Sequence, residues 1–196
     1  MNVVLIGYRG AGKSTVGKRL AERLRMRFVD IDGLVEESHG ASIREIVESA
    51  GWEHFRAMEK AAIRQISEQS GFIIAPGGGA VLDSENVGSL KNNGLIIWLK
   101  AEPEVLAERM RSDPETISSR PTLTGKGALG EIQEVLSSRN PLYVKAAMME
   151  LDTSTLGVEE VVEKILSIIT PSQPSPLKGE GEGGGNASPG TRNDSR

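Results

Sequence analysis

The chain has 196 residues, a length typical of one domain built around a single core. Hydrophobic residues make up 38% of it and charged residues 26%, a balance typical of a globular protein in water. The formal net charge of −4 argues against a surface that coats nucleic acid. The absence of cysteine excludes disulfides and a thiolate nucleophile, and two histidines cannot by themselves build a zinc site.

The first strand and helix are expected directly at the start of the sequence. Val3–Ile6 is a short apolar run, typical of a strand buried on both faces. It is too short for a signal peptide or a membrane span, so we expect a cytoplasmic protein that does not associate with a membrane. From Lys13 the period changes, because Val16, Leu20 and Leu24 recur every four residues and predict an amphipathic helix.

The next segment combines two strands with helical sequence between them. A second strand is expected at Arg27–Asp30. Polar helical sequence follows from residue 33 to about residue 69, and Gly40 and Gly51 are expected to divide it into shorter helices. A third buried strand begins at Gly71 and leads into a glycine-rich exit.

The remaining elements follow the same alternation. A fourth strand is expected at Leu95–Leu99 and a fifth at Met149–Asp152, with helices at Glu102–Arg111 and 127–145 between them. A last helix presents one broad apolar face, formed by Val158, Val161, Val162, Ile165, Leu166 and Ile169. Strands that alternate with helices in this way predict an α/β fold, with a five-stranded parallel sheet covered by helices on both faces.

Two segments lack an apolar period. Residues 112–126 carry charged and turn-forming residues, which indicate a mobile loop. Residues 171–196 contain one large aliphatic side chain, Leu177, and no aromatic one, so they cannot bury enough apolar area to offset the entropy of ordering. We therefore expect one domain over residues 1–170 and a disordered tail at 171–196, either a functionless extension or a docking segment.

The segment from Gly7 to Ser14 fits the phosphate-loop pattern G-x-x-x-x-G-K-[ST]. Its glycines let successive backbone N–H groups turn toward one anion, and the following helix adds its N-terminal N–H groups. Lys13 would reach the β- and γ-phosphate oxygens, and the Ser14 hydroxyl would coordinate Mg²⁺. The alternative is a structural glycine turn, but the position between a buried strand and an amphipathic helix favours a nucleotide site. The residues expected to bind ATP there are Gly10, Ala11, Gly12, Lys13, Ser14 and Thr15.

Three further clusters follow in the sequence. Asp30 and Asp32 lie two residues apart at the end of the second strand, where both side chains would face the same cleft, unless they only cap a helix. Arg56 and Glu59 are spaced i, i+3 on a helix, which also suits an ordinary surface ion pair. Gly77–Gly79 follows a buried strand and either admits a ligand close to the backbone or forms a tight turn.

As a set, these motifs resemble the shikimate kinase family. The resemblance covers residues 1 to about 170 and rests on motifs in the family's order and spacing. These are GxxGxGKST at 7–15, D-x-D at 30–32, F-R-x-x-E at 55–59, GGG at 77–79, Arg120-Pro121, and R-x-P-x-Y at 139–143. It implies a three-layer P-loop kinase fold with a mobile lid, and a monomer that transfers the γ-phosphoryl group of MgATP to the 3-hydroxyl of shikimate.

The same resemblance implies where shikimate would bind. Arg56 and Arg139 would hold its carboxylate, a task suited to guanidinium groups. Asp32 would contact the ring hydroxyls, as general base or as orienting group. The other substrate-binding residues it implies are Glu59, Gly77, Gly78 and Gly79, with Gly78 acting through its backbone.

It also implies the roles around the transferred phosphate. Asp30 would support the magnesium shell together with Ser14, and Arg120 would swing in with the lid to neutralise charge. Lys13, Asp32 and Arg120 are therefore the expected catalytic residues. Either Arg109 or Arg111 would stack on adenine, and the spacing does not choose between them.

Two features leave room for other interpretations. The family usually reads R-P-L-L at the lid, whereas this chain has Thr122 after Pro121, which puts lid packing and closing rate in question. Another P-loop kinase, such as a gluconate kinase, would explain the phosphate loop but not two arginines placed for a carboxylate. A non-catalytic sensor derived from a kinase would bind ligand without turnover, although Lys13 and Asp32 are both present.

Overall fold

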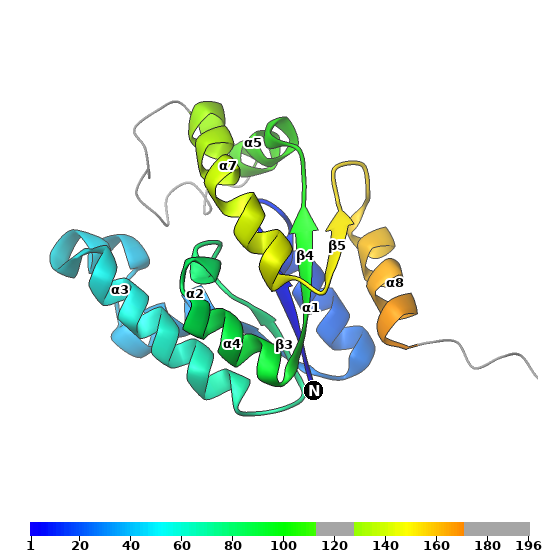
Figure 1. The fold of residues 1–196 in the computed structure, drawn as a ribbon, viewed down its shortest axis with the longest axis horizontal. Coiled ribbons are helices and arrows are strands. Elements are labelled where there is room, and N and C mark those ends of the chain that lie inside the picture. The colour runs from blue at the N-terminus through cyan, green and yellow to red at the C-terminus, as the bar shows by residue number, and fades with distance from the viewer. Residues whose placement is uncertain (113–127, 171–196) are drawn as a thin grey trace, which may run out of the picture.

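The computed structural model describes residues 1–112 and 128–170, which form a parallel sheet between layers of helices (Figure 1). The strand order is β2-β3-β1-β4-β5, and all neighbouring strands run parallel. The strands are β1 Asn2–Ile6, β2 Arg27–Asp30, β3 Phe72–Ala75, β4 Gly94–Lys100 and β5 Met149–Asp152. The predicted five-stranded parallel sheet is thus confirmed, with the bounds of β2 and β5 as expected.

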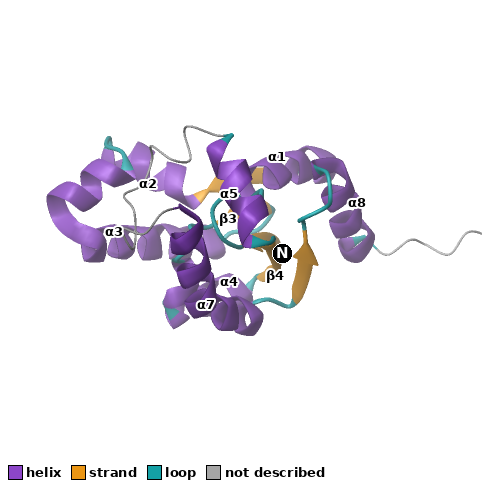
Figure 2. Cartoon of the chain, turned by 90° about the horizontal axis from the view of Figure 1, so that it is seen from above, coloured by secondary structure: helices purple, strands orange, loops and turns teal. Residues whose placement is uncertain are grey.

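The helices enclose the sheet from both sides, as the view from above shows (Figure 2). They are α1 Lys13–Leu24, α2 Ile31–His39, α3 Ile43–Ser67, α4 Ser84–Asn92, α5 Pro103–Arg111, α7 Ala128–Ala146 and α8 Val158–Ile169. A short 3₁₀ turn, η1, spans Ala80–Leu82. None of the helices in the described ranges is long and apolar enough to span a membrane.

Alternation along β1 divides the hydrophobic core between the two faces of the sheet. Val3 and Leu5 pack with the buried residues of α1, α5 and α8, whereas Val4 and Ile6 pack with α3, α4 and the end of α7. All four side chains are at most 2% exposed. Successive strand residues point to opposite faces, so a fully apolar run is what a sheet covered on both sides requires.

Both expected breaks in the long helical segment are present. Gly40 ends α2 in the left-handed conformation, with φ of 75°. Gly51 bends α3 with φ of 82° and ψ of 169°, so the helix continues in a new direction. Residues with a Cβ atom rarely adopt such backbone angles, which explains why glycine stands at both points.

Helix α4 and the preceding 3₁₀ turn were not expected from the sequence. The signal was present but weak: Asp83 accepts a hydrogen bond from the backbone N–H of Glu85 at 2.8 Å and caps the helix. Only Asn86 and Leu90 of its nine residues are buried, so the apolar period is too short to stand out. The expected lid, apart from Ser112, and the expected tail lie outside the described residues.

Candidate active site

The phosphate loop connects β1 to α1 at the carboxyl edge of the sheet. Gly12 has φ of 91° and sits directly before the first residue of α1, Lys13. Gly7 has φ of 146°, and a Cβ on it would lie 2.3 Å from the carbonyl oxygen of Leu99. These two positions require glycine, because a side chain would strain the turn at one and collide with β4 at the other.

Lys13 and Ser14 are held by oxygen atoms at the mouth of the loop. The Lys13 ammonium donates to the carbonyl oxygens of Gly7 at 3.0 Å and Tyr8 at 3.1 Å. The Ser14 hydroxyl donates to Oδ2 of Asp30 at 2.6 Å. The loop therefore places a cation, a hydroxyl and the N-terminus of α1 around one point, which suits a phosphate.

Asp30 and Asp32 reach the site in a different way from the one expected. Asp30 ends β2 and caps α2, because its Oδ1 accepts from the backbone N–H of Asp32 at 3.1 Å. Asp32 lies in the first turn of α2 and not on a strand, so the argument from a shared strand face is wrong. Both residues still line one cleft of about 1210 Å³ together with the phosphate loop and Gly78.

Arg56 and Glu59 form an ion pair whose carboxylate is buried and whose guanidinium is partly exposed, not an ordinary surface pair. Their side chains lie 2.5 Å apart, and the Glu59 side chain is 0% exposed. The Arg56 guanidinium also lies over the rings of Trp52 and Phe55, with centroid distances of 5.5 and 5.2 Å. A Cβ on Gly79 would lie 2.2 Å from Arg56, so the glycine lets the guanidinium pack directly on this turn. The second and third clusters are therefore one structural unit.

The aromatic pair beside Arg56 divides between core and site. Phe55 is 0% exposed and packs with Val35, Ile43 and Ile46. Trp52 is only partly buried and meets Phe55 edge to face at 5.9 Å. Phe55 is thus a core residue that also supports Arg56.

Helix α7 brings the R-x-P-x-Y segment to the same glycine turn. The Tyr143 hydroxyl donates to the carbonyl oxygen of Gly78 at 2.6 Å, and the tyrosine is fully buried. Arg139 lies one helical turn earlier on the same face and is only 8% exposed. Gly78 in turn approaches the phosphate loop, since a Cβ on it would lie 3.2 Å from the Gly7 carbonyl oxygen.

A partly buried ion pair between the phosphate loop and α7 was not expected from the sequence. Arg9 pairs with Glu131, whose side chain is 2% exposed. Burial raises the pKa of the neighbouring Tyr8 hydroxyl, and the Arg9 guanidinium partly offsets this effect. No spacing rule joins residues 122 positions apart, so only the folded chain reveals the pair.

The structure distinguishes the two arginines considered for adenine. Arg109 lines the large cleft and donates to the Thr153 carbonyl oxygen at 2.6 Å and to its hydroxyl at 3.1 Å. Arg111 is 69% exposed at its side chain and pairs with Glu108 on the same helix. Of the two arginines, Arg109 is therefore the one that lines the cleft. Arg120 lies outside the described residues.

The oxygen atoms beside the loop fit a magnesium ion. Ser14 and Asp30 offer a hydroxyl and a carboxylate, the hard ligands that Mg²⁺ prefers. The described part of the chain contains no group of three His, Cys, Asp or Glu side chains that would hold a metal by itself. Mg²⁺ usually keeps several waters and binds through one or two protein oxygens plus substrate phosphates, so the pair is sufficient.

A phosphate loop at the edge of a parallel sheet, which shares one cleft with Asp30, Asp32 and Gly78, defines the class of P-loop kinases that act on small molecules. The family model described as shikimate kinase matches residues 9–170. The chain belongs to the shikimate kinase family.

Individual relatives agree with this assignment. The chain is 43% identical to shikimate kinase 2 of Yersinia enterocolitica, over 85% of this chain and 94% of that protein. It is 40% identical to the shikimate kinase of Syntrophus aciditrophicus, over 84% and 89% of the two chains. Among solved structures, the shikimate kinase of Acinetobacter baumannii in complex with shikimate matches with a TM-score of 0.80 and 32% identity, covering 86% of this chain and 92% of that one.

Proposed function

We propose that this chain transfers the γ-phosphoryl group of MgATP to the 3-hydroxyl of shikimate, giving shikimate 3-phosphate and ADP. The observation that carries the proposal is the packing of Arg56 on Gly79 while Tyr143, one turn from the buried Arg139, bonds Gly78. Arg56 thus contacts the glycine turn, and Arg139 lies on α7 one helical turn from the residue that bonds the turn. A carboxylate on a small acceptor is the group that such a pair binds best.

The residues of the cleft divide the remaining tasks. The Lys13 ammonium and the N-terminus of α1 hold the transferred phosphate, while Ser14 and Asp30 hold Mg²⁺. The ion, when bound, neutralises charge on the phosphate oxygens. Asp32 orients the acceptor hydroxyl or takes its proton, and Arg120 neutralises charge on the transferred group. Arg109 packs on the adenine. The protein acts as a monomer in the cytoplasm.

The arginine role is open to a direct test with matched substrates. The assay measures ADP release with MgATP and shikimate, gluconate or no acceptor. We expect release that depends on shikimate, and an Arg56→Ala variant that loses about 10²-fold or more in kcat/KM. A shikimate derivative with the carboxylate reduced to an alcohol should be a poor acceptor for the parent and should lose little more in the variant.

Three results would contradict the proposal. Equal release without an acceptor would indicate an ATPase, and a preference for gluconate would indicate another sugar-acid kinase. ATP binding without release under any condition would indicate a sensor.

Arg111→Ala and Arg109→Ala form a matched pair for the adenine site, and only Arg109→Ala should raise the KM for ATP.

A further inference from the structure

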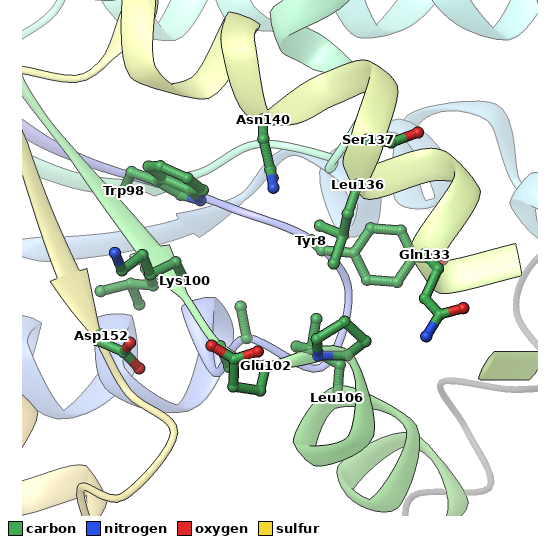
Figure 3. Close-up of a pocket in the computed structure, with 14 residues that line it drawn as sticks. Tyr8, Trp98, Lys100, Glu102, Leu106, Gln133, Leu136, Ser137, Asn140 and Asp152 are labelled. Carbon is green, nitrogen blue, oxygen red and sulfur yellow. The ribbon is translucent and has the colours of Figure 1, made fainter. Parts of the chain in front are cut away.

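The loop after β5 begins with a buried threonine that is fixed to the neighbouring strand. Thr153 directly follows β5 and is only 2% exposed. Strands β4 and β5 end side by side at Lys100 and Asp152, which also line a cavity of about 430 Å³ (Figure 3). The backbone N–H of Thr153 donates to the Lys100 carbonyl oxygen at 2.8 Å. The start of the loop is therefore attached to the end of β4.

This threonine also holds the guanidinium of Arg109, which lies in the last turn of α5. Nη1 of Arg109 donates to the Thr153 hydroxyl at 3.1 Å, and Nη2 donates to the Thr153 carbonyl oxygen at 2.6 Å. The Thr153 hydroxyl itself donates to the Lys100 carbonyl oxygen at 3.1 Å. One residue thus binds the guanidinium at two points and connects it to the sheet.

The chemistry of the hydroxyl fixes the direction of these bonds. A carbonyl oxygen can only accept, so the single hydroxyl proton is directed to Lys100 and an oxygen lone pair is left for Arg109. The N–H bonds of a guanidinium lie in its plane, so both contacts meet its edge and leave its faces for stacking. Arg109 and Thr153 both line the large cleft, so the contacts set the plane that Arg109 presents there.

We propose that Thr153 is a positioning residue for the nucleotide, because its hydroxyl sets the plane in which Arg109 packs on the adenine. The inference rests on the adenine role proposed above for Arg109. It is Arg109 that contacts the base, and Thr153 acts through it. A long side chain that is ordered before binding loses less conformational freedom when the ligand arrives, so removing the hydroxyl should weaken nucleotide binding.

Isothermal titration calorimetry of the full chain with MgADP tests the inference without any acceptor. Thr153→Val has nearly the shape of threonine but lacks the hydroxyl, and we expect its Kd to be about fivefold higher than that of the parent. Thr153→Ser retains the hydroxyl and should stay within about twofold of the parent. Magnesium pyrophosphate carries phosphates without adenosine, so its Kd should not change in either variant.

A double mutant separates positioning of Arg109 from a general effect on the loop. Arg109→Ala should raise the Kd for MgADP about tenfold. Adding Thr153→Val to Arg109→Ala should then change the Kd by less than about twofold, because the side chain that Thr153 positions is already absent. Ser154→Ala is the matched control, since the Ser154 hydroxyl accepts from the backbone N–H of Glu102 at 3.0 Å, a contact that does not involve Arg109. It should leave the Kd within about twofold of the parent.

The inference is overturned if Thr153→Val binds MgADP as the parent does, or if its effect is equally large in the Arg109→Ala background. It is also overturned if the Kd for pyrophosphate rises by the same factor, since the phosphate loop would then be the cause. Should Thr153→Val fail to fold, Thr153→Ala also removes the hydroxyl and allows the same comparisons.

The titrations are independent of the reaction proposed for the chain. Unchanged affinity in Arg109→Ala would overturn this inference together with the adenine role, while shikimate-dependent ADP release by the parent would still support the proposed function. Conversely, the expected pattern of MgADP affinities in a chain that does not phosphorylate shikimate would support the role of Thr153 and contradict the proposed function.

Discussion

The glycine turn of residues 77–79 is held from two sides by residues far apart in the sequence. Arg56 packs on Gly79, and Tyr143 bonds to the carbonyl oxygen of Gly78. The turn therefore has little freedom to move, although it carries no side chains of its own. A backbone fixed in this way can present the same N–H groups to each acceptor molecule.

Replacing Tyr143 with phenylalanine isolates the contribution of its hydroxyl. The ring, which stacks on Trp98 at 5.5 Å between centroids, remains in place. The Gly78 carbonyl oxygen loses its 2.6 Å partner, so we expect the free energy of unfolding to fall by about 1 kcal/mol. The looser turn should also raise the KM for shikimate more than that for ATP. Urea denaturation and steady-state kinetics check both effects, and two equal KM changes would count against the turn as the cause.

At the scale of elements, the strands were easier to predict than the helix between β3 and β4. Buried parallel strands are continuous apolar runs, and turn residues mark their ends, as at Asp30 and Gly94. Helix α4 covers the sheet with only two buried residues, so its stability depends on tertiary contacts and on its cap. Neither is visible as a period in the sequence.

Asp83 connects the stability of α4 to pH. The backbone N–H of Glu85, and then the Lys60 ammonium, hold the pKa of this carboxyl below its ordinary value of 3.8. The charged form therefore stabilises the fold above the ordinary pKa, and the contribution is lost as the pH falls through the lowered folded-state pKa. Asp83→Asn keeps the helix cap but removes the charge. The parent should therefore have a free energy of unfolding about 0.5 kcal/mol higher than the variant at neutral pH, and this difference should disappear in acid.

The matched variant Asp83→Ala removes the cap as well as the charge. It should cost about 1 kcal/mol at neutral pH and should stay less stable than Asp83→Asn in acid. Chemical denaturation across the acid range measures both differences. If the stability difference between the parent and Asp83→Asn grows as the pH falls, the predicted direction of the pH dependence is wrong.

The bend of α3 at Gly51 is a second feature with a clear energetic consequence. An added Cβ would meet no atom within 4 Å, so the cost of Gly51→Ala comes only from its φ of 82°. We expect a loss of about 2 kcal/mol. Gly88→Ala in α4 is the control, because its Cβ also meets nothing while the helical backbone suits alanine, and it should stabilise by about 0.5 kcal/mol. Equal effects in denaturant melts would remove the argument from backbone strain.

At the scale of the whole molecule, the parallel sheet explains how much of the site the sequence could predict. The phosphate loop, Asp30 and Gly77–Gly79 all follow the ends of strands, and parallel strands end at one edge. Their proximity therefore follows from the strand pattern. The positions of the α7 residues do not follow from the strand pattern. Whether Arg139 and Glu131 reach that edge depends on the path of the helix across the sheet.

The domain boundary expected near residue 170 leads to a test on the full chain. Helix α8 ends at Ile169, and the sequence beyond Thr170 has one large aliphatic residue. A chain that ends at Thr170 should keep its midpoint of thermal unfolding and its kcat/KM for shikimate within about twofold. A clear drop in either quantity would assign the last 26 residues a stabilising or regulatory role.

The two outer strands of the sheet, β2 and β5, have only four residues each. On β5, Glu150 and Asp152 are exposed, and on β2, Arg27 is exposed. An open edge with unpaired N–H and C=O groups invites another strand, and short charged edges discourage it. A second β5 laid alongside the first would bring carboxylates together. The fold therefore protects itself against growth into a larger sheet and against the aggregation that such growth begins.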